Sequence, residues 1–432
     1  MRLYVVVVAA VSITALTACP QCKNPATAAG QVTDRFVKVD KPIPGEYVVV
    51  LKEPDKAVAG QAVALQANSL VAKYGGATKR TFQAAIRGFS MTGTEAQAKA
   101  LSSDEQVAYV QENQVIQISD TETKATWGID RIDQRDLPLD QTYNYNASGK
   151  GVHAYIIDTG IRISHQDFGG RADVAFDAQN DGKNGIDCHG HGTHVAGTVG
   201  GTVYGVAKNV SLHAVRVLDC KGSGSTESVV AGIDWVTQNG ARPAVANMSL
   251  GGPADPALDD AVRKSIAAGV VYAIAAGNDS ADACLDSPAR VDVAITVGAT
   301  TDGDVRASFS NYGNCVDIFG PGYQITSDWN EGDLATNTIS GTSMATPHVT
   351  GSAALYLEAH PTATPADVAA ALVDNSTPDH VKNPGNCTSN HLLYTGFINA
   401  TPPATPPSSA VQPGHTGTAV AAASVSRPVC RQ

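Results

Sequence analysis

Four near-continuous apolar runs constrain the fold of this chain more than any other feature. They occupy residues 152–158, 212–218, 245–250 and 270–275. Runs of this kind are typical of parallel strands that are covered on both faces. Helical stretches at 227–238 and 257–268 follow two of the runs, and each ends at a glycine signal. Because strands and helices alternate, we predict a doubly wound α/β domain with a parallel sheet, spanning residues 126–399.

A smaller module precedes this domain at residues 45–119. Strand patterns occur at 46–51, 86–91, 107–110 and 115–118, with a helical pattern at 62–74. Thr94 and Gln97 have the spacing of a capping box that opens a second, short helix. Strand–helix–strand–helix–strand order predicts a ferredoxin-like α+β module.

The N-terminus has the form of an export signal. Met1-Arg2 is followed by an apolar stretch to Ala18, which is shorter than the roughly 20 residues that cross a bilayer. The segment ends at Leu16-Thr17-Ala18-Cys19, which resembles a bacterial lipoprotein box. The alternative is an ordinary signal-peptidase site, which Leu16 at −3 fits poorly. We expect a signal peptide at 1–18, a lipid on Cys19, and a linker at 19–44.

The C-terminus and the overall charge exclude other classes. Residues 400–432 are rich in Thr, Pro, Ala, Gly and Ser, so we expect a low-complexity tail. The chain has 30 Lys and Arg against 41 Asp and Glu, a net charge of −11, which argues against a nucleic-acid partner. Export would make the eight cysteines candidates for disulfides, and a lipidated Cys19 would leave an odd number.

Three polar residues stand where strands or glycine-rich turns meet helices. Asp158 ends the first apolar run, His191 lies in the string His189–Gly197, and Ser343 lies in Gly341–His348. Taken singly, the Asp and the Ser are commonly helix or turn caps. A zinc site is disfavoured because His191 and His194 are three residues apart and lack the Glu of the zinc-protease motif.

Together the three segments resemble the subtilisin-like serine proteases, in particular the proteinase K and aqualysin branch. Their order is Asp, His, Ser, separated by 33 and 152 positions. Further matching strings are Arg131–Arg135, Val245–Gly252 and Ser308–Gly313, and the resemblance runs from Trp127 to Tyr394. It implies a three-layer subtilisin-like α/β fold with a parallel sheet, and a serine endopeptidase.

The resemblance assigns roles to four residues. Ser343 matches the nucleophile, His191 the general base and acid, and Asp158 the carboxylate that orients the imidazole. Asn278 matches the side chain that stabilises the oxyanion. His189 is the one alternative to His191, and we expect His153, His194 and His348 to be structural.

The resemblance also implies how a substrate binds. Two chain edges would pair with an extended protein or peptide substrate: Gly222, Ser223 and Gly224, and Ser249, Leu250 and Gly251. Main-chain pairing tolerates many sequences, so cleavage should be broad. Ala275, Ala276 and Gly277 leave a roomy pocket that should suit large apolar or aromatic side chains.

Calcium and disulfides are further expectations from the resemblance. Asp317 matches a Ca²⁺ carboxylate, with the carbonyls of Asp292 and Ala294. A second Ca²⁺ site would use Asp130, Asp133, Gln134 and Asp140, with Thr142 where a relative has Asn. A plain acidic surface is the alternative for both sites. Cys188–Cys220 and Cys284–Cys315 match two disulfides of the branch, and Cys387 and Cys430 remain a candidate pair.

The 45–119 module resembles the family's inhibitory propeptide, which blocks the cleft until it is removed. We therefore expect a secreted, monomeric, self-processing zymogen that is cut between Ser119 and Trp127. A catalytically silent binding module with the same fold is the main alternative. A triad esterase is disfavoured because the chain has no Gly-x-Ser-x-Gly sequence.

Overall fold

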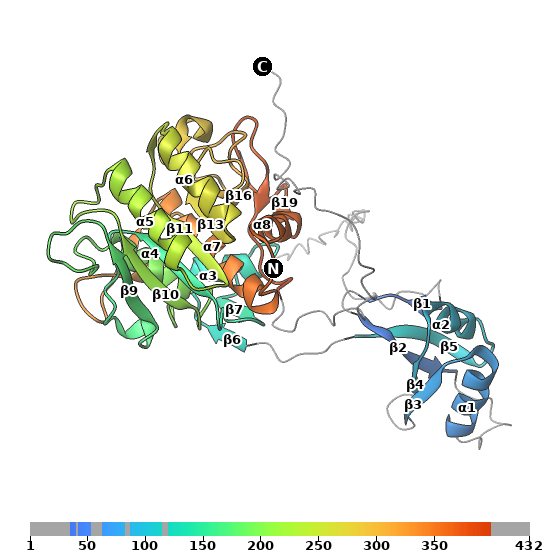
Figure 1. Cartoon of the computed structure of the whole chain (residues 1–432). Helices are drawn as coiled ribbons and strands as arrows, with labels where there is room; N and C mark the ends of the chain where they lie inside the picture. Colours follow the sequence, from blue (N-terminus) through green and yellow to red (C-terminus); the bar gives the residue numbers. More distant parts are fainter. Residues whose placement is uncertain (1–34, 40–41, 53–62, 83–86, 115–119, 399–432) are drawn as a thin grey trace, which may run out of the picture. The chain divides into compact units, whose positions relative to one another are not determined.

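The computed structural model describes residues 35–39, 42–52, 63–82, 87–114 and 120–398. The chain forms two compact units, one ending at Gln117 and the other beginning at Ile118 (Figure 1). The expected signal peptide, Cys19, the strand at 115–118 and the tail at 400–432 lie outside the described residues. None of the described helices is both long and apolar enough to cross a bilayer.

The N-terminal unit is a five-stranded sheet with two helices. Its strands occur in the order β1-β5-β2-β4-β3, and β2 to β5 have the antiparallel order of a ferredoxin-like module, as predicted. The elements are β1 (Phe36–Val37), β2 (Pro42–Leu51), α1 (Val63–Tyr74), β3 (Ala77–Phe82), β4 (Gly88–Thr92), α2 (Glu95–Ser102) and β5 (Val107–Gln114).

The sequence predicted some of the elements of this unit and missed others. The capping box is confirmed, because Gln97 N donates to Thr94 Oγ1 and Thr94 N donates to Gln97 Oε1. Strand β3 was not predicted, since it is an edge strand rich in polar residues. Residues 36–37 lie in the segment expected to be a linker, yet they pair with β5, and Phe36 is buried in the core.

The C-terminal unit is built on a nine-stranded sheet in the order β19-β20-β16-β15-β13-β11-β8-β10-β9. All neighbours are parallel except β19 and β20. The strands are β8 (His153–Asp158), β9 (Ala172–Asp177), β10 (Ser211–Arg216), β11 (Ala244–Met248), β13 (Val270–Ala275), β15 (Ile295–Thr300), β16 (Ile318–Pro321), β19 (Thr377–Pro378) and β20 (His391–Leu392). Strands β11 and β13 are buried throughout, as their apolar runs predict.

Helices cover both faces of this sheet and enclose two hydrophobic cores, so the unit has the predicted three layers. One face carries α4 (His191–Gly200), α7 (Thr342–Ala359) and α8 (Pro365–Asp374), and the other carries α5 (Thr226–Asn239) and α6 (Pro256–Ala267). Helix α3 (Trp127–Asp133) and two 3₁₀ turns, η1 (Gln166–Phe168) and η2 (Ala283–Leu285), complete the helical elements.

Among the described residues, three strand pairs of this unit lie outside the large sheet. They are β6 (Asp120–Thr123) with β7 (Thr142–Tyr145), β12 (Gly252–Pro253) with β14 (Asp286–Ser287), and β17 (Ile325–Asp328) with β18 (Thr336–Ile339). Residues 120–123 thus pair within the C-terminal unit, ahead of the boundary at 126 that we expected.

Candidate active site

Asp158 and His191 meet at the carboxyl end of the sheet. Asp158 is the last residue of β8 and is fully buried, and His191 is the first residue of α4. His191 Nδ1 lies 2.7 Å from Asp158 Oδ1. Burial of the imidazole lowers the pKa of His191, but the charge of Asp158, their hydrogen bond and the charge of Asp187 together raise it above its ordinary value. The arrangement therefore favours an imidazolium.

Asp187 was missed by the sequence analysis. It is 6% exposed, and its Oδ1 accepts hydrogen bonds from His189 N, Gly190 N and Thr159 Oγ1, while Oδ2 accepts from the backbone and hydroxyl of Thr193. These bonds tie the residue after Asp158 to the first turn of α4. Asp187 therefore fixes the backbone on either side of His191.

Ser343 is the second residue of α7, and it exchanges two hydrogen bonds with Ser249. Ser343 Oγ donates to Ser249 O at 3.2 Å, and Ser249 Oγ donates to Ser343 O at 2.8 Å. In the described residues the Ser343 hydroxyl is thus directed to a carbonyl rather than to His191. Catalytic hydrogen bonds of this kind commonly form only with substrate present.

Asn278 follows β13 and is fixed by the start of α7. Its Oδ1 accepts hydrogen bonds from Thr342 N at 2.8 Å and Thr342 Oγ1 at 3.0 Å. Its Nδ2 has no hydrogen-bond partner among the described residues, and Asn278 lines the same pocket as Ser343. A donor therefore faces the space beside the serine.

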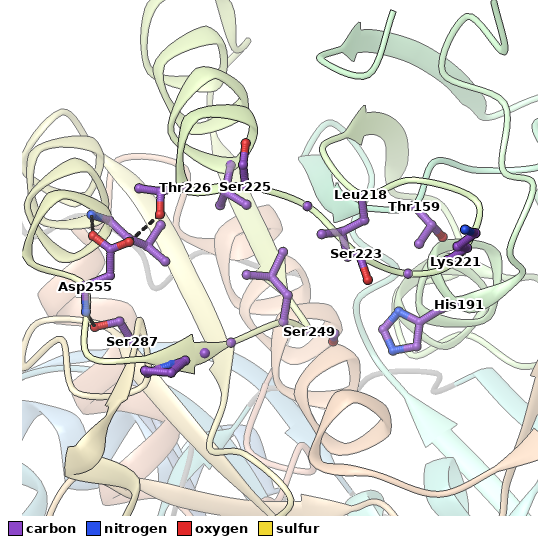
Figure 2. Close-up of a pocket in the computed structure, with 18 of the residues that line it drawn as sticks. Thr159, His191, Leu218, Lys221, Ser223, Ser225, Thr226, Ser249, Asp255 and Ser287 are labelled. Carbon is purple, nitrogen blue, oxygen red and sulfur yellow. Dashed lines mark hydrogen bonds between the residues drawn. The ribbon is translucent and has the colours of Figure 1, made fainter. Parts of the chain in front are cut away.

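The two expected substrate edges line a cleft of about 570 Å³ (Figure 2). Figure 2 shows the edge from Leu218 to Thr226 opposite the edge that starts at Ser249, with His191 at one end of the cleft. At the other end, Thr226 Oγ1 donates to Asp255 Oδ2 at 2.5 Å and Asp255 N donates to Ser287 Oγ at 2.7 Å. All six predicted edge residues line this cleft.

A second pocket of about 490 Å³ adjoins Ser343 and Asn278. It contains the predicted Ala275, Ala276 and Gly277, and it shares the 249–253 edge with the first cleft. Two acidic residues in its lining, Asp279 and Asp286, were not predicted. Asp286 follows the Asn278 motif by eight residues, and no local pattern marks it as part of the pocket.

None of the other four histidines considered above is hydrogen-bonded to Asp158 or Ser343 in the described chain. His194 and His348 are buried, and burial lowers the pKa of each to about 4, so both are neutral near pH 7. His153 Nδ1 lies 2.9 Å from His213 Nε2 at the opposite, amino end of β8. His189 lines the cleft beside His191, but of these two histidines it is His191 that is hydrogen-bonded to Asp158.

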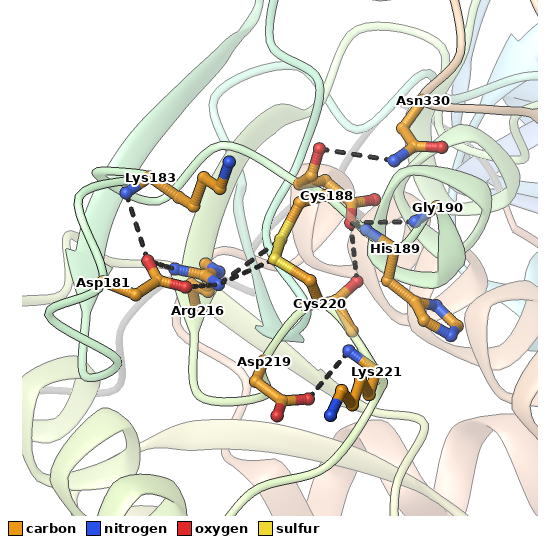
Figure 3. Close-up of a disulfide and its surroundings, with 12 residues drawn as sticks. Asp181, Lys183, Cys188, His189, Gly190, Arg216, Asp219, Cys220, Lys221 and Asn330 are labelled. Carbon is orange, nitrogen blue, oxygen red and sulfur yellow. Dashed lines mark hydrogen bonds and ion pairs between the residues drawn. A yellow bond between two sulfur atoms is a disulfide. The ribbon is translucent and has the colours of Figure 1, made fainter.

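Both expected disulfides are present. Cys188–Cys220 joins the loop ahead of His191 to the loop ahead of the Gly222–Gly224 edge (Figure 3). Arg216 Nη2 lies 3.5 Å from Cys188 Sγ of this disulfide, and Arg216 Nη1 pairs with Asp181 Oδ1 at 2.7 Å. Cys284–Cys315 joins η2 to the segment ahead of β16. Cys387 is also disulfide-bonded.

The first expected calcium site centres on Asp317. Asp317 is buried, and its Oδ2 accepts a hydrogen bond from Thr296 N at 2.9 Å, two residues after Ala294. The carboxylate thus lies beside the 292–294 loop whose carbonyls would complete the site. Among the described residues, no cluster of three or more His, Cys, Asp or Glu side chains is arranged to hold a metal. Carbonyl oxygens would therefore supply most ligands here.

The second expected calcium cluster gathers three carboxylates. Burial raises the pKa of Asp133 to about 6, and the charges of Asp130 and Asp140 add to the rise, against hydrogen bonds from Asn144. Asp130 is buried as well, and burial together with the charge of Asp140 raises its pKa. Asp140 differs, because hydrogen bonds from Thr142 lower its pKa. Within the described chain these three side chains are not grouped as ligands of one ion, so this site stays a prediction. Gln134 Nε2 donates to Pro138 O at 3.0 Å, and the role of this residue as a ligand stays a prediction.

Comparison with known proteins agrees with this geometry. A model described as the subtilase family matches residues 149–394, and a peptidase inhibitor I9 model matches residues 46–119. An extracellular serine proteinase of Thermus sp. (strain Rt41A) is 53% identical over 398 residues, which are 88% of this chain and 97% of that protein. Alkaline serine exoprotease A of Vibrio alginolyticus is 46% identical over 367 residues, 82% of this chain and 68% of that protein.

Two further proteins are similar over a smaller share of the chain. Proteinase T of Parengyodontium album is 49% identical over 255 residues, 58% of this chain and 86% of that protein. The crystal structure of a cold adapted subtilisin-like serine proteinase is 53% identical, with a TM-score of 0.62, and covers 63% of this chain and 99% of that chain. The family matches and these identities show that the chain belongs to the subtilase family of serine proteinases, with an inhibitor I9 domain ahead of its proteinase domain.

Proposed function

We propose that the chain is a secreted zymogen whose mature form is a broad-specificity endopeptidase acting through Ser343, His191 and Asp158. The observation that carries this proposal is the 2.7 Å contact between His191 and the buried Asp158, at the edge of a cleft that also contains Ser249. Ser249 in turn exchanges two hydrogen bonds with Ser343. These contacts support a triad assembled from residues of β8, α4 and α7.

Acylation begins when substrate displaces the Ser343 hydroxyl from Ser249 O toward His191 Nε2. His191 takes the Ser343 proton as the oxygen attacks the scissile carbonyl, and Asp158 stabilises the imidazolium that forms. His191 then returns the proton to the leaving amine. In deacylation, His191 takes a proton from water as the water attacks the acyl-enzyme. His191 then returns the proton to Ser343, and the carboxylic acid product is released.

The oxyanion of each tetrahedral intermediate would accept hydrogen bonds from Asn278 Nδ2 and Ser343 N. Thr342 supports this role because it holds the amide oxygen of Asn278 and leaves the amide nitrogen available. A donor of this kind lowers the barrier by about 3–4 kcal/mol. The position of Ser343 in the first turn of α7 adds the favourable field of a helix N-terminus.

Substrate would lie extended between the 222–224 and 249–251 edges, where main-chain pairing gives affinity with little sequence selectivity. The small residues Ala275, Ala276 and Gly277 support a preference for a large side chain before the scissile bond, including apolar and aromatic ones.

The I9 domain would act as an intramolecular inhibitor that the proteinase removes from itself, as its family match supports. We propose a cut between Ser119 and Trp127. The pairing of β6 with β7 and the 2.6 Å contact of Glu122 with Lys208 support the N-terminal end of this interval, because such a cut keeps β6 with the proteinase.

Calcium would stabilise the fold without taking part in catalysis. Asp317 with the carbonyls of Asp292 and Ala294 would hold one ion, and Asp130, Asp133 and Asp140 another. A bound ion supplies positive charge that offsets the repulsion among these carboxylates.

Secretion is supported by the names of the relatives, which include an extracellular proteinase. We further propose that Cys19 carries lipid on the propeptide side of the cut. Uncut precursor would then fractionate with membranes, whereas the mature proteinase would be released. A soluble Ser343→Ala precursor with a cleaved signal and unmodified Cys19 would refute the anchor.

The test of the function compares wild type with Ser343→Ala after expression in a protease-free host. Wild type should hydrolyse casein and yield a mature N-terminus between residues 119 and 127. The variant should remain a full-length precursor and be inactive, since loss of the nucleophile reduces turnover by about 10⁶. Normal maturation of the variant would exclude self-processing, and normal hydrolysis would exclude Ser343.

A further inference from the structure

The pocket beside Ser343 and Asn278 carries a net negative charge. Asp279 and Asp286 are the two charged residues of its described lining, and the others are small, apolar or neutral. The pocket lies on the acyl side of the site, because it includes Ser343 and Asn278 but not His191. It is therefore the place for the side chain of the residue that supplies the scissile carbonyl.

Asp286 is held firmly in the pocket wall. It begins β14, which pairs with β12, the continuation of the 249–251 edge. Its Oδ2 accepts a hydrogen bond from Asn311 Nδ2 at 3.0 Å, and a Cβ placed on Gly277 would lie only 3.1 Å from the same oxygen. The carboxylate thus reaches the wall formed by Gly277, directly after the two alanines.

Buried Asn311 links the two acidic residues. Its Oδ1 accepts from Asp279 N at 3.0 Å, while its Nδ2 also donates to Ala276 O at 3.0 Å. The amide therefore orients Asp286 and fixes the backbone of Asp279. Asp286 Oδ1 accepts no hydrogen bond from another described residue.

No cation offsets these charges within the described part of the chain. Neither Asp279 nor Asp286 makes an ion pair there, and Arg290, which follows four residues later, is directed to Asp259 with 2.5 Å between Nε and Oδ2. Burial and the charge of Asp279 raise the pKa of Asp286, while the bond from Asn311 lowers it. A partly buried carboxylate that has no cationic partner attracts a cationic ligand.

We propose that Asp286, assisted by Asp279, makes this pocket accept a Lys or Arg side chain immediately before the scissile bond. The proposal rests on the proposed endopeptidase function and deepens it. The aliphatic stem of the substrate side chain would pack on Ala275, Ala276 and Ala289, and its charged end would pair with Asp286. Asp286 is thus a specificity-determining residue for substrates that the alanine-lined walls alone would not distinguish.

The test uses three fluorogenic peptides that differ only in the residue before the scissile bond: Lys, norleucine or Phe. Norleucine matches the length of the Lys stem without its charge. For wild type, kcat/KM for the Lys peptide should exceed that for the norleucine peptide by about tenfold or more. The Asp286→Asn variant should lose this advantage, so that its Lys-to-norleucine ratio of kcat/KM falls toward one. Asp279→Asn should have the same effect to a smaller degree.

The matched control is Asp302→Asn, which removes an exposed carboxylate elsewhere and should leave the Lys-to-norleucine ratio unchanged. If Asp286→Asn fails to fold, the same ratio can be measured for wild type in 1 M NaCl, where screening should reduce it. Equal cleavage of the Lys and norleucine peptides by wild type would overturn the proposal and leave the endopeptidase function intact. Failure to cleave any of the three peptides would instead count against the proposed function itself.

Discussion

The side-chain oxygen of Asn278 is held by both the backbone N–H and the hydroxyl of Thr342, at 2.8 and 3.0 Å. Thr342 immediately precedes Ser343, so the residue that orients the amide donor is bonded to the proposed nucleophile. One segment thereby sets both the attacking oxygen and the donor for the oxyanion.

Replacing Asn278 with Ala should lower kcat by about 10²–10³ and change KM little, because the lost hydrogen bond forms only in the transition state. Thr342→Val keeps the backbone N–H bond and removes the hydroxyl bond, so its loss in kcat should be smaller. Steady-state kinetics on one peptide will check both. A larger loss for Thr342→Val than for Asn278→Ala would contradict this account.

Asp187→Asn should shift the acidic limb of the pH profile of kcat/KM to lower pH. The charge of Asp187 helps to raise the pKa of His191, and the base must be neutral to accept the Ser343 proton. Removing that charge lowers the His191 pKa and extends activity toward acid. The variant leaves the other nearby groups unchanged: Asp158, which is bonded to the imidazole, and His189 and Lys221, which line the cleft.

The outcome for Asp187→Asn separates positioning from folding. Active-site titration with a fluorophosphonate gives the fraction of competent enzyme, and the profile is then calculated per active site. A variant with fewer active sites but an unshifted profile would show that Asp187 only supports the fold.

The parts of this fold that were predictable are those with a signal in consecutive residues. Strands β8, β11 and β13 are covered on both faces, so their sequences are continuous apolar runs. Strand β3 lies at a sheet edge and has four consecutive polar residues, and β1 has two residues, so neither has such a signal.

The site divides in the same way. Asp158, His191, Ser343 and Asn278 lie in motifs that the family resemblance makes readable. Asp187 and Asp286 act through hydrogen bonds to residues brought close by folding, such as Thr159 and Asn311. Composition and periodicity carry no information on such contacts, so these two residues could be identified only from the structure.

The two disulfides form a matched pair for a stability experiment. They span 32 and 31 positions, so the chain-entropy model predicts that removing either one costs about 3–4 kcal/mol. Only Cys188–Cys220 joins the His191 loop to a substrate edge (Figure 3). The Cys188→Ser/Cys220→Ser variant should therefore raise KM for the Lys and norleucine peptides alike, while Cys284→Ser/Cys315→Ser, which frees the turn directly ahead of Asp286, should change mainly the Lys-to-norleucine ratio. Equal kinetic effects at equal stability loss would contradict the coupling.

Removing calcium should lower Tm, and the effect should be larger at pH 7 than at pH 5. Without the ion, the pKa of Asp133 is raised to about 6, so the folded state binds more protons than the unfolded state between pH 4 and 6. Stability of the calcium-free protein therefore falls as pH rises through this range. Saturating calcium stabilises the folded state, by about 2.7 kcal/mol at 100 times Kd.

Calorimetry in calcium and in excess chelator, at both pH values, will check this. Asp133→Asn should reduce the chelator effect, while the exposed control Asp302→Asn should retain it. An unchanged Tm in chelator would exclude both proposed calcium sites.

The central claim is that Ser343 is the nucleophile, and covalent labelling tests it most directly. Mature protein treated with a fluorophosphonate should lose all peptidase activity as one adduct per chain forms, and peptide mass spectrometry should place that adduct on Ser343. Labelling of the His191→Ala variant by the same reagent should be slow, because Ser343 then lacks its base. Full inactivation with the adduct on another residue, or retained activity after complete labelling of Ser343, would contradict the account.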